Sequence, residues 1–181
     1  MALRPLAEGD APALLEAVLA SKAQLRRRFR WVEAIGGVED AAAFIRASDD
    51  AAKAGASFAY GAFEGKREKL VGVVALDPMM AAAQRAQLGL WIRADEQDKG
   101  YAVEAGRLAV DHAFRKLSLH RLSARIDPTN RAARKVLQRL GFRYEGCLRQ
   151  DKRLNGRWID QECWGQLKAE WKPQPGARGK K

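Results

Sequence analysis

A short polar segment, residues 97–102, has the composition in this chain that is best suited to hold a ligand. It lies between an apolar run, residues 88–92, and a run with helical spacing, residues 103–114. A strand therefore leads through a glycine turn into a helix, whose first N–H groups have no partner inside the helix. Together with the positive end of the helix dipole, these N–H groups favour an anion such as a pyrophosphate. An ordinary loop containing a glycine has the same short pattern, so the rest of the chain must decide between the two readings.

The charge of the chain also favours anionic partners. Lysine and arginine number 33 against 22 acidic residues, which gives a net charge of +11. Such a field attracts a nucleotide-bearing cofactor, an acidic protein or RNA, and repels polycations. Part of the excess lies in residues 172–181, which are predicted to form a basic, disordered tail. Another part lies in Arg26, Arg27, Arg28 and Arg30, which form either a solvated helix end or an anion site.

Length and composition fit one soluble domain. The chain has 181 residues, and no apolar run approaches the roughly 20 residues that a membrane span requires. The first residues lack the apolar core of a signal peptide, so we expect a cytoplasmic protein without membrane contact. Its two cysteines, Cys147 and Cys163, have no metal-ligand spacing, and no metal site is predicted. We expect two buried, reduced thiols, with a disulfide or a nucleophilic cysteine as the alternative.

The first half of the chain predicts two helices followed by a meander of strands. Asp10 is a plausible N-cap with Pro12 in the first turn, and Gly55 closes the second helix. The Asp77-Pro78 pair is predicted to end the second meander strand. The predicted elements are a strand over 2–6, helices over 10–28 and 38–54, and strands over 57–63, 70–76 and 86–93.

The second half alternates strands and helices. Asn155-Gly156 is a strong hairpin turn, and Gly141 is predicted to end a helix. The predicted elements are helices over 101–116 and 130–140 and strands over 121–126, 142–152 and 158–167. A meander followed by this alternation predicts an α/β fold with a mixed sheet of six to seven strands and helices on both faces.

Taken together, these segments resemble the GNAT superfamily of N-acetyltransferases, and within it the RimJ/RimL type. The resemblance runs from about residue 3 to residue 171, and its motifs agree in order and spacing. They are residues 3–6, residues 88–92 with 97–105, Asp127-Pro128-Thr129-Asn130, residues 137–142, and residues 145–149 with Asn155-Gly156 and 160–171. The resemblance implies a single GNAT-like domain over residues 1–171, with acetyl-CoA as cosubstrate and no metal.

The resemblance also implies which residues hold the cofactor. The pantetheine arm would pair like an added strand with the backbone of Trp91, Ile92 and Arg93. Asn130 would bond the pantetheine near its thiol, although Asn is also a common N-cap. Arg134 would meet the phosphates of the nucleotide end, or else belong to an exposed helix face. The pyrophosphate would be held by the side chain of Gln97, the charge of Lys99 and the backbone N–H groups of Asp98, Lys99, Gly100, Tyr101 and Ala102.

The usual acid and base positions of the superfamily are changed in this chain. Acetyl transfer requires a neutral amine and a stabilised oxyanion. Where many relatives carry a glutamate base this chain has Gln87, and where other branches carry a tyrosine acid it has Leu137. RimJ/RimL-like chains often have a serine at the position of Ala133. The remaining catalytic candidates are Asp151, alternatively a turn residue, and Glu104, alternatively a residue that complements the helix dipole.

The missing base bears on the acceptor. An α-amine has a pKa of about 7.7–8.0 and a lysine side chain about 10.4, so far more of an α-amine is neutral at cytosolic pH. A site without a strong base is therefore better matched to the N-terminus of a protein or peptide, and the resemblance suggests ribosomal proteins. The alternatives are a small-molecule amine as acceptor, a non-catalytic acyl-CoA-binding module, and an RNA or ribosome binder. A monomer and a homodimer are both compatible with the sequence.

Overall fold

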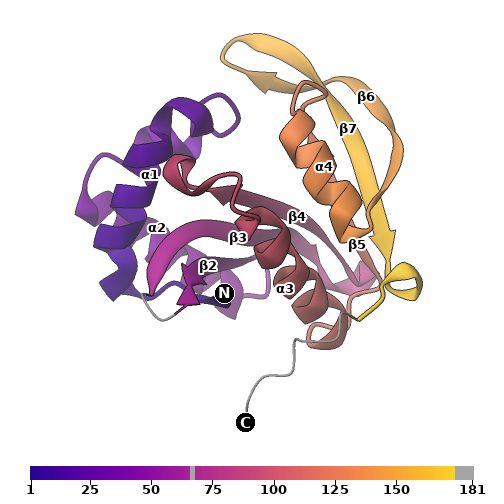
Figure 1. Cartoon of the computed structure of the whole chain (residues 1–181), viewed down its shortest axis with the longest axis horizontal. Helices are drawn as coiled ribbons and strands as arrows, with labels where there is room; N and C mark the ends of the chain where they lie inside the picture. Colours follow the sequence, from indigo (N-terminus) through magenta and orange to yellow (C-terminus); the bar gives the residue numbers. More distant parts are fainter. Residues whose placement is uncertain (66–67, 174–181) are drawn as a thin grey trace.

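The chain folds around one mixed sheet with helices on both faces, as predicted. A computed structural model describes residues 1–65 and 68–173, and these form a seven-stranded sheet in the order β1-β2-β3-β4-β5-β7-β6 (Figure 1). The strands are β1 (Ala2–Pro5), β2 (Phe58–Glu64), β3 (Lys69–Met80), β4 (Arg85–Ile92), β5 (Arg121–Ile126), β6 (Arg143–Leu154) and β7 (Arg157–Leu167). The α-helices of the described residues are α1 (Ala11–Leu25), α2 (Val38–Lys53), α3 (Tyr101–Arg115) and α4 (Arg131–Leu140). The predicted basic tail lies outside the described residues from position 174 onward.

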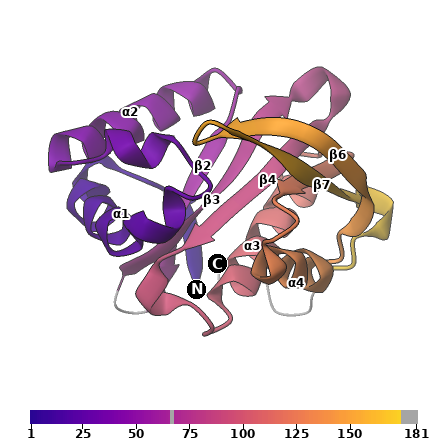
Figure 2. The ribbon, with the colours of Figure 1, turned by 90° about the horizontal axis from the view of Figure 1, so that it is seen from above.

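Two hydrophobic cores, one on each face of the sheet, hold the layers together. Helices α1 and α2 cover one face and α3 and α4 the other (Figure 2). Leu14 and Val18, one helical turn apart on α1, are fully buried in the first core together with Trp91 of β4. Leu88 of β4 lies in the second core. Side chains of β4 therefore alternate between the two cores, as the period of two in a strand requires.

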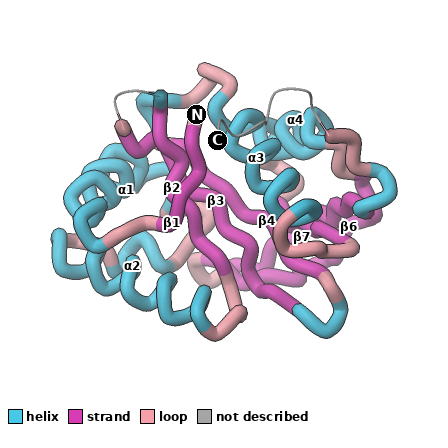
Figure 3. Tube along the Cα trace, turned by 90° about the horizontal axis from the view of Figure 1, so that it is seen from below, coloured by secondary structure: helices cyan, strands magenta, loops and turns pink. Residues whose placement is uncertain are grey.

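The pairing between β4 and β5 covers only a few residues, and the two strands separate beyond it. These strands are parallel and pair only from Arg85 with Arg121 to Gln87 with Ser123. Beyond that point β4 continues to pair with β3 and β5 with β7. The two strands therefore diverge toward their carboxyl ends, and in the described part of the chain the outer edge of β4 beyond Gln87 has no strand partner. On its other side β4 lies next to β3 (Figure 3).

Two predicted boundaries and one burial prediction were wrong. Strand β3 continues through Asp77-Pro78 to Met80, because the proline lies in a register irregularity where no ladder bond is required. Helix α1 ends at Leu25, and the following residues turn back with Phe29 N–H donating to the Leu25 carbonyl at 2.8 Å. Cys147 is exposed and Cys163 half-buried, since β6 is an edge strand; both thiols are free.

The β6–β7 hairpin turns as the sequence predicts. Asn155 and Gly156 both have positive φ, 49° and 79°, as a two-residue type I′ turn requires. The hairpin arches over the sheet toward the end of α1 (Figure 2), and Lys152 Nζ donates to the carbonyl oxygen of Arg28 at 2.9 Å. No helix in the described part of the chain is long and apolar enough to cross a membrane.

Candidate active site

The glycine turn before α3 has the geometry of an anion seat. Gly100 is the N-cap of α3 with φ 86°, and Asp98 also has positive φ, 61°. The N–H groups of Val103 and Glu104 donate to the Gly100 carbonyl, each at 3.1 Å. Within the described residues, the N–H groups of positions 98–102 donate to no acceptor. A Cβ built on Gly100 meets nothing within 4 Å, so the space beside these N–H groups is open.

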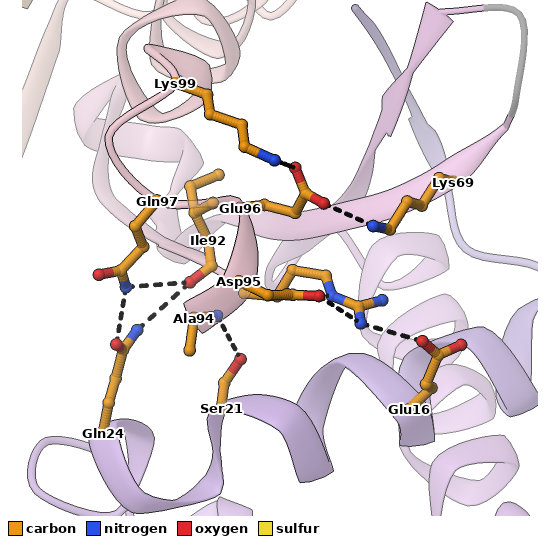
Figure 4. Close-up of polar contacts among 11 residues, drawn as sticks. Glu16, Ser21, Gln24, Lys69, Ile92, Ala94, Asp95, Glu96, Gln97 and Lys99 are labelled. Carbon is orange, nitrogen blue, oxygen red and sulfur yellow. Dashed lines mark hydrogen bonds and ion pairs between the residues drawn. The ribbon is translucent and has the colours of Figure 1, made fainter.

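A buried carboxylate just before this turn binds two lysine side chains. Glu96 is only 6% exposed, and it accepts hydrogen bonds from Lys69 Nζ at 2.5 Å and from Lys99 Nζ at 2.7 Å (Figure 4). These two bonds, the one from Lys69 first, lower the pKa of the Glu96 carboxyl. Lys99, predicted to add charge at the pyrophosphate, is thus tied to Glu96, while its ammonium retains capacity for further acceptors.

Helix α1 fixes the segment between β4 and the turn. The Arg93 guanidinium is buried and donates to Asp95 at 2.7 Å and to Glu16 at 2.9 Å. One turn further along α1, Ser21 Oγ accepts from the Ala94 N–H at 3.0 Å (Figure 4). The segment thus has two anchors on α1, and its position is set before any ligand arrives.

The unpaired edge of β4 exposes the backbone of only some of the predicted residues. The Arg93 N–H donates to the Val71 carbonyl at 2.9 Å, so Arg93 points its peptide groups toward β3. Because Ile92 lies opposite Gly72 in the antiparallel register, alternation turns the peptide groups of Leu90 and Ile92 to the free edge and those of Trp91 toward β3. Of the three residues predicted to contact the pantetheine, Trp91, Ile92 and Arg93, only Ile92 turns its peptide groups to this edge, where Leu90 joins it.

Gln24 and Gln97 cover the end of this free edge. The Gln24 side chain donates to the Ile92 carbonyl at 3.3 Å, and Gln97 Nε2 donates to Gln24 Oε1 at 2.7 Å (Figure 4). Gln97, predicted to contact the pyrophosphate, therefore links α1 to the turn. The side chain of Trp91 is buried, with its ring centroid 6.3 Å from that of Trp31.

Helix α4 follows β5, and its start lies at the gap between β4 and β5. Asn130 is the N-cap, and its Oδ1 accepts from the Ala133 N–H at 3.2 Å. Its amide nitrogen donates to no partner within the described residues and has two donors to offer a ligand. Arg134 donates to the buried carboxylate of Glu162 at 2.5 Å and to the Pro128 carbonyl at 3.0 Å. The capping role of Asn130 is thus compatible with its predicted cofactor contact, whereas Arg134 already has a carboxylate partner.

The two catalytic candidates do not lie together. Asp151 sits in the bulged part of β6 and accepts from Arg125 at 2.9 Å. Glu104, half-exposed on α3, pairs with the amino group of Met1 at 2.9 Å. Side chains alternate between the two faces along β5. Ala124 packs into the core on the α3–α4 face, so the side chain of Arg125 points to the α1–α2 face, whereas Glu104 on α3 lies on the opposite face. The two carboxylates therefore cannot act as one acid–base pair.

The point where β4 and β5 separate carries no strong base. Its last rung pairs Gln87 with Ser123, whose Oγ donates to the Ala86 carbonyl at 3.3 Å. Leu137, at the position of a tyrosine acid in other branches, is buried in the core. Tyr101, in the turn, donates to Glu64 at 2.6 Å, and this bond raises the pKa of Tyr101 to about 12. Tyr101 therefore holds its proton near neutral pH.

Sequence reasoning missed four residues that shape the site. Gln24 and Ser21 contact a segment about 70 positions away (Ile92 and Ala94), and no local pattern distinguishes them from other polar residues of the helix. Glu96 lies in a polar run that is typical of an exposed loop. A signal was available only for Leu90, because the strand alternation of residues 88–92 fixes which backbone groups share an edge.

Comparison with known proteins connects this geometry to a family. Residues 1–143 match the family model described as an acetyltransferase (GNAT) domain. The probable N-acetyltransferase YjcK of Bacillus subtilis is 36% identical over 104 residues, which cover 57% of this chain and 58% of that protein. The ribosomal-protein-serine acetyltransferase of Escherichia coli is 22% identical over 165 residues, 91% of each chain.

A solved structure agrees with the fold described above. Mycobacterium smegmatis RimJ, in complex with CoA-disulfide, superposes with a TM-score of 0.85 at 26% identity, covering 95% of this chain and 83% of that one. The match to the family model over residues 1–143, most of the chain, shows that this chain belongs to the GNAT acetyltransferase family.

Proposed function

We propose that this protein is an acetyl-CoA-dependent N-acetyltransferase whose acceptor is the N-terminal α-amine of a protein or peptide. The observation that carries the proposal is the free edge of β4 next to the unpaired N–H groups of residues 98–102. An extended chain of amides ending in a pyrophosphate matches both features at once. A cytoplasmic location is part of this proposal.

Each part of the cofactor has a matching group in the chain. The peptide groups of Leu90 and Ile92 can pair with the pantetheine amides as a neighbouring strand would. The N–H groups at the start of α3 and the dipole of that helix suit the pyrophosphate. Asn130 can donate its amide N–H groups from the other side of the gap. A backbone N–H of Leu90 or Ile92 is also available to stabilise the oxyanion that forms when the amine attacks the thioester.

The choice of acceptor follows from the absence of a base at the point where β4 and β5 separate. Gln87 and Ser123 do not take up a proton near neutral pH, so the amine must arrive neutral. With pKa values of about 7.8 and 10.4, the neutral fraction of an α-amine at pH 7.5 exceeds that of a lysine side chain by a few hundredfold. The Escherichia coli relative is named for a ribosomal protein acceptor, which supports ribosomal proteins as the first acceptors to test.

Thiol release from acetyl-CoA tests the proposal. We expect release with peptides that have a free N-terminus and far less with N-terminally blocked peptides that contain lysine. We also expect the pH dependence of kcat/KM to follow the pKa of the acceptor amine, and to move when that pKa is changed by the first residue of the peptide. Binding of acetyl-CoA without thiol release for any peptide or small amine would instead indicate a non-catalytic acyl-CoA-binding module.

A further inference from the structure

Basic side chains without a carboxylate partner gather at one end of the molecule. Arg26, Arg27 and Arg30 follow α1, and Arg153 and Arg157 flank the tip of the β6–β7 hairpin. Within the described residues none of these guanidinium groups forms an ion pair. Several arginines elsewhere do pair with a carboxylate, among them Arg4, Arg93, Arg121, Arg125 and Arg134. These five guanidinium groups at the end of the molecule are therefore available to an anionic ligand.

The two basic segments are held against each other. Lys152 of the hairpin donates to the Arg28 carbonyl at 2.9 Å, and its ammonium lies 5.9 Å from the ring centroid of Phe29. Figure 2 shows the hairpin reaching across to the end of α1. Burial lowers the pKa of Lys152, as expected for an amine covered by the neighbouring segment.

Between these segments lies a shallow cavity of about 430 Å³ that is broadly open to solvent. It is lined by Arg27, Asp127, Leu154, Asn155, Arg157 and Ile159. Asp127 supplies the only carboxylate of this lining, and its Oδ1 already accepts from the N–H and O–H of Thr129 at 2.7 and 2.6 Å. The lining thus combines two guanidinium groups without an ion pair, one carboxylate, an amide and an apolar wall, so positive charge exceeds negative charge in it.

A buried polar atom of the neighbouring residue in the chain, Arg28, also lacks a partner in the described part of the chain. This atom is the guanidinium Nε, a hydrogen-bond donor. A buried donor left unpaired costs about 1–3 kcal/mol, so such groups are usually satisfied by water or by a ligand. The Arg26–Arg30 segment therefore has donor capacity that the folded chain itself does not use.

We propose that this cavity binds an acidic side chain of the acceptor, so that the preferred substrate is an N-terminus followed closely by Asp or Glu. The inference rests on the proposed function, because it places the acceptor chain beside the gap between β4 and β5. A concave site with Leu154 and Ile159 in its wall suits a peptide better than the backbone of RNA, which binds to extended basic surfaces. Arg27 and Arg157 are specificity-determining residues for that acidic side chain.

Binding can be measured without turnover. Fluorescence anisotropy would follow labelled peptides that begin with N-acetylserine and continue with either Asp and Glu or the isosteric Asn and Gln. We expect the acidic peptide to bind at least tenfold more tightly than its amide counterpart, with the preference weakening as salt is raised. We expect the double variant Arg27→Gln/Arg157→Gln to lose that preference. The matched control Arg85→Gln removes a charge at the start of β4 and should retain it.

Equal binding of the acidic and amide peptides, or an unchanged preference in the double variant, would overturn the proposal. So would an oligonucleotide of equal charge that binds more tightly than the acidic peptide and displaces it, since the surface would then be one for nucleic acid. Thiol-release assays distinguish a failure of this inference from a failure of the proposed function. For turnover, both peptides are made with a free N-terminal serine in place of N-acetylserine. Equal turnover of these two free-amine peptides contradicts the acidic specificity alone, whereas selective binding of the acidic peptide without turnover of its free-amine form contradicts the acetyltransferase proposal alone.

Discussion

Replacing Gly100 by alanine should separate cofactor binding from folding. Gly100 has φ 86°, and a Cβ at this position meets no protein atom within 4 Å. The substitution therefore adds no clash in the free protein and costs only the left-handed backbone strain, about 1–2 kcal/mol. For a chain of this size, each kcal/mol lowers Tm by about 2–4 °C. The variant should remain folded, with Tm lowered by about 2–8 °C.

The effect on the cofactor should be larger than the effect on folding. The added methyl group occupies the open space beside the N–H groups of residues 98–102, where we place the pyrophosphate. A hydrogen bond to a charged group contributes about 1.5–3 kcal/mol. Losing two such bonds would weaken binding by about 3–6 kcal/mol, which is at least a hundredfold in Kd. Isothermal titration calorimetry with coenzyme A measures this loss directly.

Gly55 provides a matched control for the backbone strain. It also has positive φ, 67°, and a Cβ there also meets nothing within 4 Å, but it follows α2 and lies outside the candidate site. Gly55→Ala should lower Tm by a similar amount and leave the Kd for coenzyme A unchanged. If Gly100→Ala bound coenzyme A as tightly as the Gly55 variant, the placement of the pyrophosphate would be refuted.

Two further predictions concern stability. Burial lowers the pKa of His112, whose Nε2 lies 3.1 Å from the Tyr60 hydroxyl. The folded chain therefore binds fewer protons at this residue than the unfolded chain does. The free energy of unfolding should fall as pH drops below about 6.5. Urea titrations from pH 7.5 to 5.5 would show this fall, and a His112→Phe variant should lose that contribution to it. A Cβ on Gly106 would lie 2.6 Å from Leu140 Cδ1 at the contact of α3 with α4, so Gly106→Val should overpack that contact and cost about 1–3 kcal/mol. An unchanged midpoint in urea would contradict the close helix contact.

The local parts of the fold were predictable because neighbouring residues determine them. Gly141 follows from the need for positive φ after the last turn of a helix, Gly100 from the tight turn between a strand and a helix, and Asn155-Gly156 from the geometry of a two-residue hairpin turn. The apolar run of residues 88–92 predicts a strand at that position. Each of these features depends on contacts within a few positions along the chain.

Contacts between distant segments were not predictable in the same way. The burial of Glu96 depends on Lys69, a residue of another strand, and the position of Gln97 depends on Gln24 of α1. The continuation of β3 past Pro78 depends on pairing of Met79 with Ala86. A helical or strand period shows which face of an element is apolar, but it does not show which polar partner the fold brings to that face.

The most direct test of the central claim is the effect of coenzyme A on backbone amide signals of the ¹⁵N-labelled protein. If the cofactor binds at the turn and along the free edge of β4, the amides of residues 98–102 and of Leu90 and Ile92 should show the largest shifts. Arg93, whose N–H is bonded to Val71, should shift much less. Saturable binding that leaves the amides of residues 98–102 unmoved would contradict the claim.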